Sequence, residues 1–344
     1  MTRPDTQQLR VALEALVTDR VTPGYAAMLR TGGETVELFG GTLDDEAGSA
    51  APDRDTVYDI ASLTKVVATW GVMGRLVADG SVRLQDPVSR FFPNVRPGWA
   101  KHTLADLLLH RTQLPTATWL SQYGEEPGAI RTGVLSAEPV DRPSVPAQYL
   151  NRGYIVLGWV VENVVGEPFD QVVAREWWGP LGLGDTHFNP LDAGVPTRRI
   201  APTEHIGGEV GRLRGVVHDE NARWLGGVAG HAGAFSTLSD LSRYAGLVVG
   251  DDASLRLAPD FLRLSQTPVA EWTDDSYRAL GWWVSRDGRL VRHDGFTGTT
   301  ICLAPHTGDV GVLLTNAVYF GRRNPRMSAV RGLLSAIISG GHHP

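Results

Sequence analysis

The stretch Asp59-Ile60-Ala61-Ser62-Leu63-Thr64-Lys65 decides how the rest of the sequence is interpreted. A helical pattern begins at Ser62 and ends at Asp79-Gly80. One face of this predicted helix carries four apolar residues at helical spacing, namely Val66, Trp70, Met73 and Val77. Serine is a favoured N-cap, but its usual partner three residues later is Glu or Gln. Lys65 instead places a cation in the first turn, where it opposes the helix dipole. Ser62 and Lys65 therefore indicate a catalytic role rather than a helix cap.

The spacing of Ser62 and Lys65 suits nucleophilic catalysis. Side chains three residues apart share a helix face and reach each other. A serine hydroxyl needs a base to become a nucleophile, and a lysine serves where burial and positive potential favour its neutral form. The N–H groups at the helix start could also stabilise an oxyanion. Ser-x-x-Lys is a short pattern that also arises by chance, so its context has to decide.

The composition is that of a globular protein. The 344 residues are 42% hydrophobic and 20% charged, with a formal net charge of −6. No basic tract indicates a nucleic-acid partner, and no apolar run reaches the roughly 18 residues of a membrane span. Cys302 is the only cysteine and lies in an apolar run, which predicts a buried packing role. Residues 1–11 contain charges and no apolar stretch, so we expect no secretory signal and a cytoplasmic location.

The order of predicted elements favours an α+β fold. Strand patterns fall near both chain ends, at residues 24–29, 35–39, 281–284, 290–292, 299–304 and 310–314. The clearest helical patterns cover residues 6–18, 104–109, 154–165 and 327–338. We therefore expect one antiparallel sheet built from both chain ends and flanked by helices, with a mainly helical lobe inserted.

These patterns also predict a division into two domains. Residues 1–62 together with residues 230–344 would form an α/β domain, and residues 63–229 a mainly helical domain. The active site is expected in the cleft between them.

Two further motifs stand in the order and context of a known family. Tyr149-Leu150-Asn151 opens a predicted helix, and His293-Asp294-Gly295 lies on a predicted strand near the C-terminus. With Ser62 and Lys65, they resemble the Ser-x-x-Lys, Tyr-x-Asn and Lys- or His-x-Gly motifs of serine β-lactamases and penicillin-recognising enzymes. The likeness covers roughly residues 25–334 and is to the class C-like branch, which includes D-alanyl-D-alanine carboxypeptidases, family VIII carboxylesterases and acyltransferases.

The resemblance implies a catalytic set of Ser62, Lys65 and Tyr149. Ser62 would attack an acyl carbon and become acylated, while Lys65 and Tyr149 share its proton. A tyrosine acts as a base only where cations stabilise its phenolate, and Lys65 and His293 are the candidates. Asn151 would orient Lys65 and a polar group of the substrate.

The resemblance also implies residues for substrate binding. The oxyanion hole would use the backbone N–H groups of Ser62 and Phe296. A loop around Gly230-His231-Ala232-Gly233 would border the cleft. The residues expected to bind substrate are Asn151, His231, His293, Gly295, Phe296 and Asn316.

Simpler interpretations exist for the single motifs. Tyr149 could merely start a helix, and His293 could be an ordinary strand histidine; all three motifs together favour a site. Residues 217–233 contain His and carboxylate side chains of the kind that binds zinc, but the helical two-histidine spacing is missing. No metal and no other cofactor is therefore predicted. The Gly-x-Ser-x-Gly motif of α/β-hydrolases does not occur.

Two departures from the family pattern concern the substrate. In residues 109–115, Arg111 and Gln113 replace small residues. The approach to Tyr149, Pro146-Ala147-Gln148, lacks the more usual Pro-Gly turn. We expect these positions to reshape the cleft wall and to encode the substrate class, without touching the catalytic set.

The leading interpretation is a serine hydrolase that forms an acyl-enzyme on Ser62, most simply a carboxylesterase acting on a small-molecule ester or amide. A cytoplasmic location favours an ester over β-lactams and peptidoglycan. The first alternative is a biosynthetic acyltransferase, in which an amine or alcohol replaces water. The next alternative is a D-alanyl-D-alanine carboxypeptidase or β-lactamase, and the least favoured alternative is a non-catalytic ligand sensor. Neither a nucleic-acid nor a membrane partner is expected, and the oligomeric state is left open.

Overall fold

The computed structural model describes residues 3–112, 114–115, 119–138, 148–207, 211–250, 252–273, 276–322 and 325–340. Gln113, Pro146 and Ala147, three of the predicted departures from the family pattern, lie outside the described residues.

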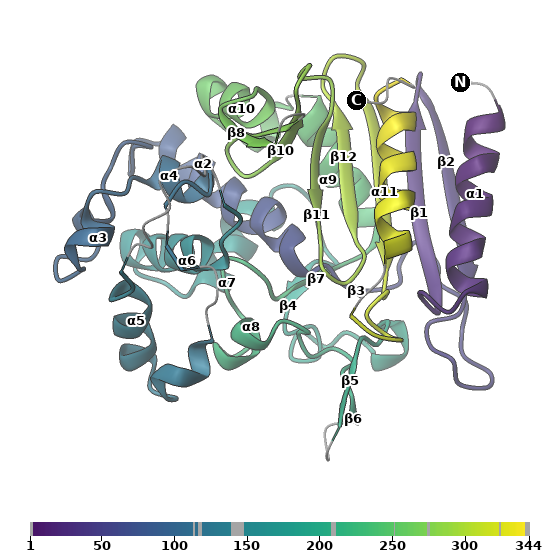
Figure 1. Cartoon of the computed structure of the whole chain (residues 1–344), viewed down its shortest axis with the longest axis horizontal. Coiled ribbons are helices and arrows are strands. Elements are labelled where there is room, and N and C mark those ends of the chain that lie inside the picture. The colour runs from purple at the N-terminus through teal and green to yellow at the C-terminus, as the bar shows by residue number, and fades with distance from the viewer. Residues whose placement is uncertain are drawn as a thin grey trace.

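One large antiparallel sheet organises the molecule (Figure 1). Across the described residues its strands follow the order β2 (Glu34–Gly41), β1 (Gly24–Thr31), β13 (Asp309–Thr315), β12 (Thr300–Ala304), β11 (Val291–Asp294), β10 (Trp283–Ser285), β9 (Ser276–Arg278) and β8 (Ala270–Thr273). β1 and β13 come from opposite ends of the chain and pair directly, with Tyr25 opposite Thr315 and Arg30 opposite Val310. The predicted α+β fold, with one sheet built from both chain ends, is confirmed.

The turn of the first hairpin, between β1 and β2, is set by two glycines in the sequence. Gly32 and Gly33 connect β1 to β2 and have φ angles of 56° and 85°. A two-residue hairpin turn with two left-handed residues matches the twist of the flanking strands, and glycine adopts that conformation without strain.

Helices cover both faces of the sheet. The helices of the described residues are α1 (Arg3–Thr18), α2 (Trp70–Ala78), α3 (Pro97–Ala100), α4 (Leu104–Leu108), α5 (Pro127–Leu135), α6 (Asn151–Val165), α7 (Phe169–Val173), α8 (Glu220–Trp224), α9 (Leu238–Val249), α10 (Pro259–Gln266) and α11 (Pro325–Ile338). α1 and α11 lie side by side on one face, and α9 lies behind the sheet (Figure 1). Leu9, Leu13 and Leu334 fill the layer under α1 and α11. Cys302 lies in the same layer, where burial raises the pKa of its thiol to about 12, as expected for a packing residue.

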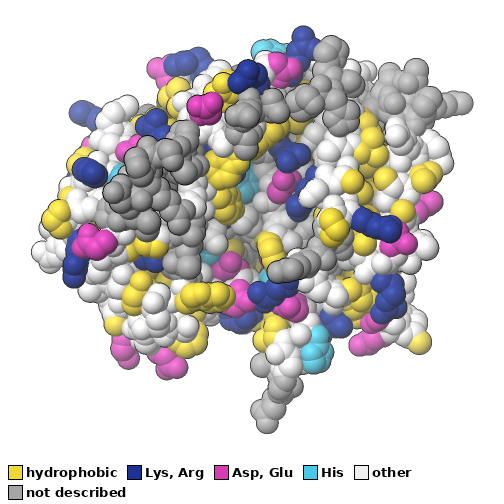
Figure 2. Space-filling view, in the orientation of Figure 1, with side chains coloured by type: hydrophobic (Ala, Val, Ile, Leu, Met, Phe, Trp, Pro, Cys, Tyr) yellow, Lys and Arg dark blue, Asp and Glu magenta, His cyan; other side chains and the backbone are white. Residues whose placement is uncertain are grey.

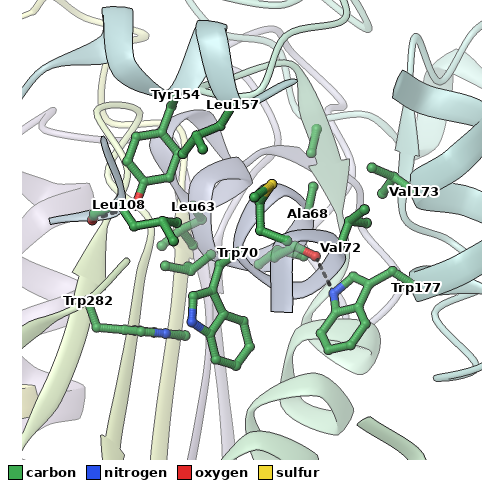
Figure 3. Packing of buried hydrophobic residues seen from close by; sticks show 14 of the residues in the cluster. Leu63, Ala68, Trp70, Val72, Leu108, Tyr154, Leu157, Val173, Trp177 and Trp282 are labelled. Carbon is green, nitrogen blue, oxygen red and sulfur yellow. Dashed lines mark hydrogen bonds between the residues drawn. The ribbon is translucent and has the colours of Figure 1, made fainter. Parts of the chain in front are cut away.

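The remaining helices form a lobe on one side of the sheet (Figure 1). A single apolar core runs from strands such as β12 and β13 into this lobe. Within it Trp70 lies between Trp177 and Trp282, with ring centroids 6.1 and 5.8 Å away (Figure 3). The division into two domains at residues 62 and 230 stays a prediction. One apolar core is shared by the large sheet and the helical lobe.

A second, small sheet links the lobe to the large sheet. It consists of β3 (Tyr58–Asp59), β7 (Ala234–Ser236) and β4 (His187–Phe188) in that order. β3 leads directly into Ser62, so the pairing of β3 with β7 places the candidate nucleophile. A third pair, β5 (His205–Gly207) and β6 (Gly211–Arg212), projects from the molecule (Figure 1). None of the described helices is long and apolar enough to span a bilayer.

Some strand limits differ from the sequence prediction. The strand expected over residues 281–284 begins at Trp283, because Gly281 has a φ of 85° and its N–H bonds to the Leu108 carbonyl outside the sheet. β8 and β9 were not predicted, since their few residues are largely polar.

Candidate active site

Ser62 lies on an irregular helical start rather than at the cap of a regular helix. Ala61–Leu63 form a 3-10 turn, Lys65–Thr69 form a π-helical turn, and α2 follows. Ala61 has a φ of 46°, in the left-handed region that is costly for residues with a Cβ atom. Strained residues and π-helical turns are frequent at functional sites. They persist only where contacts with the surrounding structure fix the strained conformation.

Asp59 supplies the contacts that hold this turn. Its carboxylate accepts hydrogen bonds from the Ala61 N–H at 2.8 Å and from the His218 N–H at 2.7 Å. Asp59 is buried, and this burial raises the pKa of its carboxyl group above the ordinary value. From the large sheet, Thr297 Oγ1 donates to the Asp59 carbonyl and Thr299 Oγ1 donates to the Ile60 carbonyl. The segment that precedes Ser62 is therefore fastened on two sides.

Lys65 is fully buried and uses its amino group in three hydrogen bonds. Its Nζ donates to Ser62 Oγ at 3.0 Å, to Asn151 Oδ1 at 2.9 Å and to the His231 carbonyl at 3.0 Å. A lysine amino group makes at most three such hydrogen bonds as a donor, so these three oxygen atoms account for the surroundings of Nζ. The arrangement points one N–H at the serine oxygen and leaves Lys65 no freedom to turn away.

The structure places the His231 side chain away from the surface of the cleft, and its expected contact with substrate stays a prediction. The side chain is fully buried, and its Nε2 pairs with Asp219 Oδ1 at 2.9 Å. His231 contributes its backbone carbonyl to Lys65. Burial by itself raises the pKa of Asp219, but the charge and hydrogen bond of His231 outweigh it and hold the pKa well below its ordinary value. Asp219 is thus a carboxylate close to the buried Lys65.

Tyr149 lies beside Lys65 and among further polar rings. The Lys65 ammonium is 4.8 Å from the centroid of the Tyr149 ring. The rings of His110 and His293 have centroids 4.7 and 6.3 Å away, and the Arg278 guanidinium is 5.4 Å away. These contacts surround the Tyr149 ring within the described residues.

His293 does not provide the cation that was expected for Tyr149. Burial, followed by the charges of Lys65 and Arg278, lowers the pKa of His293 well below its ordinary value, so the ring is neutral at neutral pH. Its Nδ1–H donates to the Asp294 carbonyl at 3.1 Å. Burial also lowers the pKa of Arg278, but a guanidinium keeps its proton at neutral pH. Arg278 is therefore the second cation beside Tyr149.

A cleft of about 380 Å³ brings these groups together. Ser62 and Tyr149 line it from the helical side, and the sheet and α11 complete it with Trp272, Arg278, Trp283, Arg292, His293, Asp294, Gly295, Phe296 and Arg331. Near the middle of the face shown, the surface is hollowed where side chains of several types meet (Figure 2). A larger hollow of about 590 Å³ lies between α10 and the turn after β10, and it contains none of the predicted site residues.

Gly295 and Phe296 shape one edge of the cleft. A Cβ atom on Gly295 would lie 2.5 Å from the Ile60 carbonyl, so only glycine lets the sheet approach the segment before Ser62. The Phe296 ring is exposed and stacks on His218 with centroids 5.7 Å apart. Ser62 and Phe296, whose backbone N–H groups are the expected oxyanion donors, both line this cleft.

Asn316 and Arg111 do not face the cleft. Asn316 is buried, and its amide donates to the Leu43 and Pro202 carbonyls and accepts from Thr22 Oγ1. These bonds occupy both atoms of its amide, so in this structure Asn316 joins loops, and its contact with substrate stays a prediction. Arg111 pairs with Asp106 on α4 at 3.0 Å and is not among the residues that line the cleft, so its effect on the cleft wall also stays a prediction.

The histidine and carboxylate residues of the segment 217–233 pair with one another or with neighbours. His218 Nε2 lies 3.0 Å from Glu204 Oε2, and His231 pairs with Asp219. Across the described ranges, no group of three or more His, Cys, Asp or Glu side chains is arranged to hold a metal ion.

Sequence reasoning missed two residues at the site. His110 lies in the segment 109–115, and nothing in the sequence of that segment indicates contact with Tyr149. Arg278 stands in a short polar strand without any motif, and only the folding of β9 beside β10 brings it into the cleft.

The whole architecture matches a solved structure. The chain is similar to the octameric penicillin-binding protein homologue from Pyrococcus abyssi, with a TM-score of 0.78 and 21% sequence identity over 97% of this chain and 77% of that one. At this identity the likeness establishes the fold. The fold is therefore that of this penicillin-binding protein homologue.

The family follows from the sequence comparisons. The beta-lactamase family profile matches residues 9–334, so the chain belongs to the beta-lactamase family and is a serine hydrolase of that family. Proteins from Salmonella paratyphi A and Salmonella enteritidis PT4, each named "Putative D-alanyl-D-alanine carboxypeptidase", are 28% identical over 83% of this chain and 76% of their own length.

Proposed function

We propose that this chain hydrolyses carboxylic esters through an acyl-enzyme on Ser62. The observation that carries the proposal is the contact between Lys65 Nζ and Ser62 Oγ at 3.0 Å, in a cleft that is also lined by Tyr149 and Phe296. Ser62 and Lys65 act as nucleophile and adjacent base, with Tyr149 as the second proton acceptor.

The chemistry proceeds in two steps. The Ser62 oxygen bonds to the acyl carbon while its proton passes to Lys65 or Tyr149, and that proton then goes to the departing alkoxide as its bond to the carbon breaks. Water next attacks the acyl carbon, and Ser62 regains a proton as the acid leaves. The N–H groups of Ser62 and Phe296 stabilise the oxyanion in both steps, and one such donor typically contributes about 3 kcal/mol.

The second candidate function is a carboxypeptidase, and Arg278 supports it. Its guanidinium is buried, lines the cleft and has no hydrogen-bond or ion-pair partner at Nε among the described residues. Asp294, by contrast, already pairs with Arg292 and Arg331. A buried guanidinium N–H that lacks a hydrogen-bond partner is costly, so Arg278 suits a substrate that carries a carboxylate near the scissile bond. The names of the Salmonella relatives agree with such a substrate.

Intact-mass trapping of the acyl-enzyme tests these proposals. The panel contains a fluorophosphonate, a penicillin, a neutral ester, its carboxylate-bearing analogue and a D-alanyl-D-alanine peptide, with Ser62→Ala as control. We expect a mass adduct on the wild-type chain, none on the control, and turnover of at least one ester. Turnover of the peptide without turnover of esters would replace the first candidate by the second. Absence of any adduct would overturn both.

The same panel separates hydrolysis from acyl transfer. Reactions with an ester are repeated in the presence of added amines and alcohols. We expect the free acid as the product throughout. An amide or a new ester formed in preference to the acid would favour the biosynthetic acyltransferase.

A further inference from the structure

His110 contacts the Tyr149 segment through its backbone and its side chain. Its carbonyl accepts the Gln148 N–H at 2.9 Å, and its Nδ1 accepts the Leu150 N–H at 3.0 Å. Both residues next to Tyr149 in the chain are therefore hydrogen-bonded to one histidine. Because Nδ1 accepts, the neutral ring carries its proton on Nε2.

The His110 ring also packs between two tyrosines. Its centroid is 4.7 Å from that of Tyr149 and 5.1 Å from that of Tyr154, with interplanar angles of 30° and 31°. The Tyr154 hydroxyl donates to the Leu108 carbonyl at 3.1 Å, which fastens the far side of the stack. The segment after α4 and the start of α6 thus form one rigid unit, with Tyr149 at its cleft side.

The backbone of His110 is adapted to this contact. Its φ is 57°, in the left-handed region that residues with a Cβ atom rarely occupy. Burial, followed by the charges of Arg278 and Lys65, lowers the pKa of His110 well below its ordinary value. The ring therefore stays neutral at neutral pH and packs on Tyr149 without adding a charge.

The orientation of Tyr149 matters because its other neighbours are polar or charged. Lys65 faces it from the turn before α2, Arg278 from β9 and His293 from β11. A phenol among these groups could turn toward any of them, and misplacement of a catalytic group by about 1 Å can lower a rate by about a hundredfold.

We propose that His110 is a positioning residue, which holds the Tyr149 ring in the orientation that proton transfer from Ser62 requires. The inference rests on the proposed function of Ser62 and Tyr149, and it assigns a role to the loop after α4.

Substitution of His110 tests the inference through the rate of fluorophosphonate labelling of Ser62, followed by intact mass. Asparagine tolerates the left-handed conformation and keeps an acceptor for the Leu150 N–H, but it removes the stacked ring. We expect His110→Asn to fold and to label about 10 to 100 times more slowly than the wild type. His110→Ala, which also loses the acceptor, should be slower still.

Two controls separate positioning from general structural support. His102 is a buried histidine of the same lobe that does not contact Tyr149, so His102→Asn should label within about threefold of the wild type. In a Tyr149→Phe background, His110→Asn should have little further effect, because the two substitutions then act on the same step.

Each outcome bears on one proposal. Labelling of the wild type together with a wild-type rate in His110→Asn overturns the inference and leaves the proposed function intact. An undiminished effect of His110→Asn in the Tyr149→Phe background also overturns it. A wild-type chain that is never labelled overturns the proposed function itself.

Discussion

Arg278 is a buried arginine of the cleft whose Nε has no hydrogen-bond partner among the described residues. It is one of three arginines that line the cleft, and Arg292 and Arg331 share Asp294 as their counter-charge. Arg278 stacks over the Trp272 ring at 4.1 Å and over Tyr149, and among the described residues its Nε has no hydrogen-bond partner. The net charge of the chain is −6, so this positive site is a local feature of the cleft.

For this residue we predict that Arg278→Gln weakens binding of a carboxylate-bearing ester but not of the matched neutral ester. A hydrogen bond to a charged group contributes about 1.5–3 kcal/mol, so KM for a carboxylate-bearing ester should rise roughly tenfold to hundredfold. KM for the matched neutral ester should change by less than about threefold. Steady-state kinetics on both esters checks this, with Arg263→Gln, at an exposed arginine of α10, as control. An equal rise for both esters would show that Arg278 supports the cleft without recognising the anion.

Close packing of α2 holds the turn that carries Lys65. The indoles of Trp177 and Trp178 both donate to the Val67 carbonyl, at 2.9 and 3.0 Å, within the π-helical turn that precedes α2. Figure 3 shows Trp177 beside this helix. A Cβ atom on Gly71 would lie 1.9 Å from the Trp177 ring, so the tryptophan approaches only because position 71 has no side chain.

At the scale of this element, Gly71→Ala should destabilise the chain. Overpacking a buried contact costs about 1–3 kcal/mol, and moving Trp177 would also disturb its bond to Val67. Gly128→Ala, in exposed α5 with no atom within 4 Å of the added Cβ, should be neutral or stabilising by up to about 1 kcal/mol. Urea unfolding of both variants measures the difference. Equal free energies of unfolding for the two variants would contradict the packing argument.

The whole molecule buries several titratable groups in their neutral form. Burial lowers the pKa of His110 and of His293 well below the ordinary value, and it lowers the pKa of His102 as well. The unfolded chain binds protons at these histidines below about pH 6.5, whereas the native state binds fewer. Burial of Asp59 and Asp240 raises the pKa of these carboxyl groups and works in the opposite direction.

We therefore predict that the free energy of unfolding falls as the pH is lowered from about 7.5 to about 5.5. Each fully buried histidine contributes up to about 1.4 kcal/mol of this loss at one pH unit below 6.5. His293→Asn should reduce the loss, while His306→Asn, at an exposed position, should not. Urea titrations at both pH values provide the measurement. A His293→Asn variant with the wild-type pH dependence would show that this ring is protonated in the native state.

The sequence alone determined several of the elements and the order of the motifs. Two runs of strand-forming residues separated by Gly32-Gly33 predict the first hairpin, and the helical spacing after Ser62 predicts the helix that the structure contains. These features are local, because neighbouring residues set the periodicity and the turn conformation. The three motifs indicated a serine acyl-transfer site for the same reason: each is a short pattern on one element.

The tertiary structure decided which groups meet at the site. Asn316 and His231 were expected at the cleft, but their partners, Pro202 and Asp219, come from distant loops and bury them. His110 and Arg278 reach Tyr149 from the loop after α4 and from β9, segments that carry no motif. Contacts across long sequence separations leave no periodic pattern in a single chain, so the charge and orientation of the neighbours of Ser62 could be known only once the chain had folded.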